Sequence, residues 1–186
     1  MVKLNKIYTR TGDGGLAGLV DGSRVSKAGA RMTAIGEVDE ANAAVGLAVA
    51  ALGNTDTAQA LRRIQNELFD LGADIATPGD IEGALRIVPD QVDRLEREID
   101  AMNAHLEPLT SFILPGGSTE VAALHLARTV TRRAERAAVD LNESEELNPH
   151  LLAYLNRLSD HLFVAARHVA AGQGGDVLWQ PGATRG

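Results

Sequence analysis

A row of arginines in the segment 118–141 is the strongest candidate for binding an anionic substrate. If this segment is helical, Arg128 and Arg132 share one face, where like charges four residues apart slightly destabilise the helix. Planar guanidinium groups donate paired hydrogen bonds to phosphate and carboxylate. The row therefore predicts either a phosphate-binding face or a solvated face with salt bridges to a neighbouring helix. It comprises Arg128, Arg132, Arg133 and Arg136, with Glu135 as the only acid among the same nine residues.

A glycine-rich run near the start of the chain is a second candidate for anion binding. Glycines allow backbone N–H groups to converge on an anion, and hydroxyls and Arg10 can add donors. Lys27 follows the run as a further candidate partner for phosphate. The spacing is not that of a P-loop, and no buried strand precedes it as a dinucleotide fingerprint requires, so a flexible loop is the alternative. The run consists of Thr9, Arg10, Thr11, Gly12, Asp13, Gly14, Gly15, Leu16, Ala17 and Gly18.

Polar side chains also stand on otherwise apolar helical faces. Asn156, Asp160 and Phe163 follow at i, i+4 and i+7, so one face would carry an amide, a carboxylate and an aromatic ring. The amide could hold a metal-bound phosphate, but a polar seam between helices explains the pattern equally well. Asp39 stands beside an apolar stripe, where we expect it to be partly buried and paired with an arginine of the row.

Cysteine and histidine chemistry is largely excluded. The chain has no Cys, which excludes thiol catalysis, disulfides and Cys-ligated zinc or iron–sulfur sites. None of the five His stands in an E-x-x-H or H-E-x-x-H pattern, so the sequence is neither a di-iron bundle nor a zincin.

Composition narrows the class of protein further. The 186 residues, 45% hydrophobic and 23% charged, are typical of one globular domain. No apolar run is long enough for a transmembrane helix, and the first residues lack the apolar core of a secretory signal. The net charge of −7 argues against nucleic acid as a partner. We expect a soluble, cytoplasmic protein.

Helical spacing of apolar residues after residue 30 predicts an all-α fold that positions these groups. Breakers and caps mark the helix ends, among them Gly53, Ser118 or Thr119, the pair Asn148-Pro149, and Gly172. Short connections favour a five-helix antiparallel bundle. We expect helices over 31–52, 57–76, from Pro89 to before Pro108, over 119–141 and over 149–171.

We expect one domain, 1–186, in three parts. A glycine-rich loop segment without strands covers 1–30, the helical bundle covers 31–171, and a flexible glycine-rich tail covers 172–186.

Taken together, six segments resemble the PduO-type ATP:cob(I)alamin adenosyltransferases. They follow one another in the family's order between about residues 5 and 170. The segments are 7–15, 24–27 and 36–42 in the N-terminal part, and 112–117, 127–136 and 155–160 in the C-terminal part.

This resemblance implies a five-helix bundle of the ferritin-like type that assembles as a homotrimer with active sites between subunits. It implies transfer of the 5′-deoxyadenosyl group of ATP to cob(I)alamin, which yields adenosylcobalamin and triphosphate. The implied cations are Mg²⁺ on the triphosphate and K⁺. A reductase for cob(II)alamin and an adenosylcobalamin-dependent mutase are the implied protein partners.

The resemblance also assigns roles to single residues. Asp39 would pair with Arg128 across the subunit boundary, and Phe112 would pack under the corrin and keep the lower axial ligand away. Phe163 and Asp160 would line the cobalamin pocket together with those three residues. The implied catalytic residues are Asp39, Phe112, Arg128 and Arg132. The implied ATP-binding residues are Thr9, Arg10, Thr11, Gly12, Asp13, Gly14, Gly15, Gly18, Lys27, Arg132, Arg133, Glu135, Arg136 and Asn156.

One departure from the family concerns the glycine-rich run. Leu16 and Ala17 stand where relatives usually carry a hydroxyl residue, so side-chain donors are absent there although backbone donors remain.

Two other functions fit part of the pattern. A carrier that delivers adenosylcobalamin to an acceptor mutase would use the same pocket without turnover of ATP. A helical assembly module would bind no nucleotide, and a cluster of arginines in an acidic chain argues against it.

Overall fold

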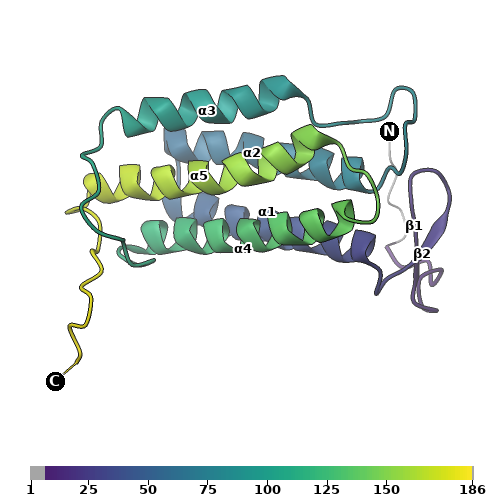
Figure 1. Ribbon diagram of the computed structural model, residues 1–186, viewed down its shortest axis with the longest axis horizontal. Coiled ribbons are helices and arrows are strands. Elements are labelled where there is room, and N and C mark those ends of the chain that lie inside the picture. The colour runs from purple at the N-terminus through teal and green to yellow at the C-terminus, as the bar shows by residue number, and fades with distance from the viewer. Residues whose placement is uncertain (1–6, 186) are drawn as a thin grey trace.

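The computed structural model describes residues 7–185 and confirms the all-α bundle. Within those residues the chain forms five helices that run alternately in opposite directions (Figure 1). Their bounds agree closely with the sequence prediction because the caps are local signals. The helices are α1 (Ala30–Leu52), α2 (Asp56–Ile75), α3 (Pro89–Asn103), α4 (Thr119–Asn142) and α5 (Pro149–Ala171).

Side-chain caps start three of the helices. The Thr55 hydroxyl accepts a hydrogen bond from the Ala58 N–H at 3.2 Å, and Ser118 accepts from Val121 at 3.4 Å. The Asn148 side chain accepts from the His150 N–H at 3.1 Å. These bonds satisfy N–H groups that have no partner inside the helix, which fixes where each helix begins.

The helices enclose one apolar core. α1 packs against α2 and α4, while α5 packs against α4 and α3. Tyr154 of α5 is fully buried and donates its hydroxyl proton to the Glu67 carboxylate of α2 at 2.7 Å. Burial, followed by the charge of Glu67, raises the pKa of Tyr154. No helix in residues 7–185 is long and apolar enough to cross a membrane.

The glycine-rich segment is not a plain loop, which corrects the expectation that it lacks strands. Strands β1 (Leu16–Gly18) and β2 (Arg24–Ser26) form an antiparallel hairpin with Ala17 opposite Val25. A φ of 83° at Gly22 permits the turn. The hairpin lies at the end of the bundle where α1 begins (Figure 1).

The other end of the bundle carries the loop 104–118 and the C-terminal segment (Figure 1). We expected 172–186 to be a flexible tail. Instead, residues 176–179 lie along the loop, with Ile113 and Leu178 forming an antiparallel bridge. The fold therefore places the hairpin and the loop 104–118 at opposite ends of the bundle.

Candidate active site

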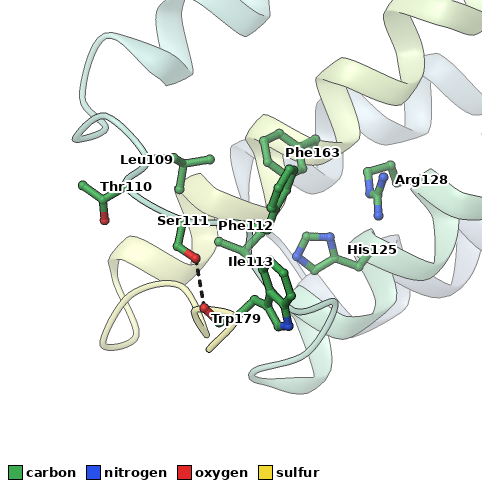
Figure 2. A pocket seen from close by; sticks show the side chains of 9 residues that line it. All are labelled: Leu109, Thr110, Ser111, Phe112, Ile113, His125, Arg128, Phe163 and Trp179. Atoms are coloured by element: carbon green, nitrogen blue, oxygen red, sulfur yellow. Dashed lines mark hydrogen bonds between the residues drawn. The ribbon is translucent and has the colours of Figure 1, made fainter. Parts of the chain in front are cut away.

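A cavity of about 750 Å³ opens between the loop 104–118, α4, α5 and the C-terminal segment (Figure 2). We name it the Phe112 pocket. Its wall is mixed, with three aromatic rings beside an imidazole, a guanidinium and two hydroxyls. The lining residues are Leu109, Thr110, Ser111, Phe112, Ile113, His125, Arg128, Phe163 and Trp179.

Phe112 lies on the surface of this pocket and not in the core. Its side chain is 77% exposed, and its ring centroid lies 6.0 Å from that of Trp179 at an interplanar angle of 60°. An exposed large aromatic residue on a cavity rim is typical of a binding surface. Packing in the core of this chain is therefore excluded as the role of Phe112.

Two cationic or titratable side chains in the pocket each have a buried nitrogen without a hydrogen-bond partner among the described residues. The Arg128 guanidinium lies 5.9 Å from the Phe163 ring centroid, and its buried Nε has no hydrogen-bond partner among residues 7–185. Burial, and then the charge of Arg132, lowers the pKa of Arg128. His125 is 2% exposed, and its Nδ1 is likewise unpartnered within the described chain. Burial, followed by the charge of Arg128, lowers the pKa of His125, so the imidazole stays neutral at pH 7.

A smaller hollow of about 320 Å³ lies on the same α4–α5 surface. We name it the Arg132 cleft. Asn156 Nδ2 donates to Glu135 Oε1 at 2.8 Å, and Arg136 donates to the Arg132 carbonyl at 3.2 Å. Two guanidinium groups face a single carboxylate, so the cleft favours an anion. Its lining residues are Arg132, Glu135, Arg136, Val139 and Asn156.

The two hollows are adjacent. Arg128 of the pocket and Arg132 of the cleft are four residues apart on α4, which is about 6 Å along the helix axis. Phe163 of the pocket and Asn156 of the cleft are seven residues apart on α5, about 10 Å along its axis. A ligand in the pocket and a ligand in the cleft can therefore meet.

Arg133 lies outside both hollows. Its Nε donates to the Glu37 carboxylate at 2.5 Å, and it forms a second ion pair with Glu40, both on α1. The hydrogen bonds to these carboxylates raise the pKa of Arg133. Within this chain Arg133 joins α1 and α4, and the nucleotide contact that we expected from the sequence stays a prediction.

Asp39 is exposed, which corrects the expectation of partial burial. Its carboxylate makes no ion pair or hydrogen bond with any other described residue. It stands one position beyond Val38, which is 2% exposed, and the sharp change in environment follows from the 100° step between helical neighbours. The structure does not bring Asp39 and Arg128 together within one chain.

The glycine-rich run is organised by Lys27. Its Nζ donates to the Gly12 carbonyl at 2.9 Å, and its backbone N–H donates to the Gly15 carbonyl at 2.9 Å. The hydroxyls of Thr9 and Thr11 lie 2.9 Å apart. No hydrogen bond or ion pair among the described residues joins this run to the Arg132 cleft. The remaining members of the run, Arg10, Asp13, Gly14, Leu16, Ala17 and Gly18, also lie at the hairpin end.

Asp160 lies between the pocket and α3. Arg157 Nη1 donates to its carboxylate at 3.1 Å, and both residues line a groove of about 490 Å³ that shares Phe163 with the pocket. Asp160 therefore lies beside Phe163 but outside the lining of the Phe112 pocket, and its contact with a corrinoid stays a prediction.

Sequence reasoning missed His125 and Trp179 as pocket residues. His125 stands three residues before Arg128, so helical spacing alone places it on the same face. Trp179 is the single tryptophan and lies in the presumed tail, where no periodic signal exists.

Comparisons with known proteins identify the family of this chain. The family described as Cobalamin adenosyltransferase matches residues 7–169. The corrinoid adenosyltransferase of Mycobacterium tuberculosis (strain ATCC 25618 / H37Rv) is 53% identical over 192 residues, 99% of this chain and 97% of that protein. The corrinoid adenosyltransferase of Bacillus subtilis (strain 168) is 47% identical, with 94% and 92% covered.

A solved structure gives the same result. A variant PduO-type ATP:corrinoid adenosyltransferase from Lactobacillus reuteri, complexed with cobalamin and ATP, matches with a TM-score of 0.86 and 40% identity. The match covers 94% of this chain and 99% of that one. On the strength of the fold, the paired hollows and these relatives, the chain belongs to the cobalamin adenosyltransferase family.

Proposed function

We propose that the chain transfers the 5′-deoxyadenosyl group of ATP to the cobalt of cob(I)alamin and releases triphosphate. The cobalt(I) electron pair attacks C5′, a cobalt–carbon bond forms, and the C5′–oxygen bond breaks with its electrons on the leaving triphosphate. The observation that carries the proposal is the adjacency of an aromatic pocket and an arginine cleft on one α4–α5 surface. The products are adenosylcobalamin and triphosphate.

Placement of the two substrates supplies much of the catalysis. Cobalt(I) is itself a strong nucleophile, so the protein need not activate one. Holding the reacting atoms in line converts a bimolecular step into an effectively unimolecular one. A corrin in the Phe112 pocket and a nucleotide in the Arg132 cleft would lie within this reach.

Stabilisation of the negative charge on the leaving triphosphate supplies the remaining part of the catalysis. Arg132 and Arg136 carry the positive charge of the cleft, and Lys27 with the glycine-rich run adds a further cation and backbone donors. Mg²⁺ arrives with ATP as part of the substrate and neutralises developing charge on the phosphate oxygens.

Phe112 prepares the cobalt for reduction. Its exposed ring provides apolar bulk where the lower axial base would otherwise bind. Cobalt(II) without that base accepts an electron more readily. Reduction of cobalt(II) to cobalt(I) requires an electron donor, so we infer a cob(II)alamin reductase as partner and an adenosylcobalamin-dependent mutase as acceptor. The requirement for ATP and a reductant favours a cytoplasmic location.

We further propose a homotrimer with each site shared between subunits. The glycine-rich run and the Arg132 cleft make no hydrogen bond or ion pair with each other in the described chain, yet both are needed around one triphosphate. Asp39 and Arg128 each lack an ionic partner in that same part of the chain, so a neighbouring subunit can supply it. A site shared across a symmetric subunit interface would bring the glycine-rich run to the Arg132 cleft and would pair Asp39 with Arg128.

Turnover distinguishes the enzyme from a carrier. Incubation with ATP, Mg²⁺ and cob(I)alamin should convert the corrinoid spectrum to that of adenosylcobalamin over many turnovers. Binding of adenosylcobalamin without consumption of ATP would favour the carrier, and failure to bind either substrate would favour an assembly module.

A further inference from the structure

The loop that carries Phe112 has few hydrogen bonds within itself. It spans residues 104–118, a length at which irregular loops are usually functional. Residues 111–116 make four hydrogen bonds within the part of the chain that the structure describes, and three of them go to residues 177–179. The fourth, from Gly116 to Leu114, stays inside the loop. We name residues 176–179 the C-terminal strap.

The strap holds the backbone on both sides of Phe112. The Trp179 N–H donates to the Phe112 carbonyl at 2.8 Å, and the Leu114 N–H donates to the Val177 carbonyl at 2.7 Å. The Ser111 hydroxyl donates to the Trp179 carbonyl at 2.9 Å, which Figure 2 draws as a dashed line. Because Phe112 is 77% exposed, core packing does not fix its position. The three hydrogen bonds to the strap fix the backbone on either side of it.

One buried arginine anchors the strap to the bundle. Arg167 of α5 is 8% exposed, and its Nε donates to the Asp176 carboxylate at 3.0 Å. Its Nη2 donates to the Glu107 carbonyl at 2.8 Å. A single guanidinium therefore joins the strap, the start of the Phe112 loop and α5. Removing the carboxylate would leave a buried charge without its counter-ion.

The chain leaves α5 through a turn that directs it back to this loop. Gly174 and Gly175 have φ values of 103° and 95°, a region that residues with a side chain rarely adopt. The Gly175 N–H donates to the Ala170 carbonyl at 2.8 Å, so the turn closes on the last residues of the helix. This turn sets the direction of the strap independently of the ion pair between Asp176 and Arg167.

We propose that the C-terminal strap positions Phe112 and that Arg167 and Asp176 are the positioning residues that anchor it. The proposal rests on the proposed function of the Phe112 pocket. Docking of the strap is nevertheless a property of the protein alone, so it can be measured without a corrinoid.

The first test uses Trp179 as an internal probe. It is the only tryptophan in the chain and is 44% exposed when docked. In Asp176→Asn, emission should shift to the red, and quenching by acrylamide should rise about twofold as the indole goes from 44% to nearly full exposure. Unchanged emission and quenching in this variant would overturn the proposal.

The chain offers a matched control at the opposite end of the bundle. Arg31 is 5% exposed and, like Arg167, binds one carboxylate and one backbone carbonyl, those of Glu145 and Ile75. Glu145→Gln removes the counter-ion of this second buried arginine, far from the strap. Its Trp179 emission should equal that of the unmodified protein, and a shift as large as in Asp176→Asn would overturn the specific role of the anchor.

The second test asks whether docking positions Phe112. With ATP present, cob(II)alamin bound to Asp176→Asn should show less four-coordinate cobalt. Turnover from cobalt(II) should fall on the order of tenfold, because misplacement by ~1 Å can cost about 10²-fold. The KM for ATP should stay unchanged, cobalt supplied in the +1 state should restore the rate, and Asp176→Glu should recover most of the signal.

The outcomes separate the strap from the proposed function. If Trp179 is released but the four-coordinate signal and the rate are unchanged, the strap docks without positioning Phe112 and the proposal is wrong. If the rate falls together with thermal stability and ATP affinity, the role is structural and the proposal is again wrong. If the unmodified protein transfers no adenosyl group, the proposed function fails, whatever the fluorescence shows.

Discussion

Arg132 and Arg133 are adjacent in the sequence, yet their guanidinium groups serve different faces of α4. Arg132 lines the cleft with Asn156 of α5, whereas Arg133 is bound to Glu37 and Glu40 of α1. A step of 100° between helical neighbours separates them. The first is free to bind an anion, and the second already has two counter-ions.

Substitution should therefore separate the two arginines. Arg132→Ala should weaken ATP binding by about 1.5–3 kcal/mol, the usual contribution of a charge-assisted hydrogen bond. Arg133→Ala should lower the melting temperature and leave more of the ATP affinity intact. Isothermal titration with ATP and thermal unfolding of both variants make the comparison. Equal losses of ATP affinity would contradict the division of roles.

Asp39 and Arg128 should depend on each other across a subunit boundary. Asp39→Asn and Arg128→Ala should each impair corrinoid handling, because breaking a pair that the subunit interface buries typically costs about 3–5 kcal/mol. Mixing the two inactive variants should restore about one quarter of the rate, since random assembly gives that share of interfaces with both native residues. A double-mutant cycle without coupling, or mixtures with no restored activity, would refute the pairing.

Phe112→Ala should change the cobalt and not the fold. The side chain is 77% exposed, so the loss of about 3–5 kcal/mol that follows truncation of a buried Phe is not expected. The lower base should remain coordinated and turnover from cobalt(II) should fall strongly, while cobalt(I) restores much of the rate. The deciding measurement is the spectrum of cob(II)alamin bound to this variant in the presence of ATP. A four-coordinate signal equal to that of the unmodified protein would rule out this role.

Neutral His125 should make stability depend on pH. Because its pKa in the folded state lies below the ordinary value of 6.5, the unfolded chain takes up the proton first as pH falls. The free energy of unfolding should therefore decrease as pH drops below about 6.5, and His125→Gln should flatten this part of the profile. Denaturant titrations between about pH 7.5 and 5 test this. Parallel profiles for the two proteins would show that His125 is not the responsible group.

The sequence predicted the bundle well because the relevant signals are local. The helix starts are marked by the capping residues Thr55, Ser118 and Asn148 and by the prolines at positions 89 and 149. The hairpin of β1 and β2 was missed because three residues per strand show too little alternation, and glycine in the segment indicates loop.

Only those parts of the site were predicted in which helical spacing determines which residues share a face. Arg128 and Arg132 on α4 and Asn156, Asp160 and Phe163 on α5 were placed correctly relative to one another. The exposure of Asp39 and the partners of Arg133 depend on which helix packs beside α1, and periodicity does not specify that. The docking of residues 176–179 rests on backbone hydrogen bonds and one ion pair, which leave no pattern in the composition.

Transfer of the adenosyl carbon is the central claim, and an isotope label at C5′ of ATP tests it most directly. After incubation with Mg²⁺ and cob(I)alamin, the label should appear on the carbon bound to cobalt, with one triphosphate released for each adenosylcobalamin formed. Hydrolysis of ATP with no label in the corrinoid, or release of diphosphate in place of triphosphate, would contradict the account.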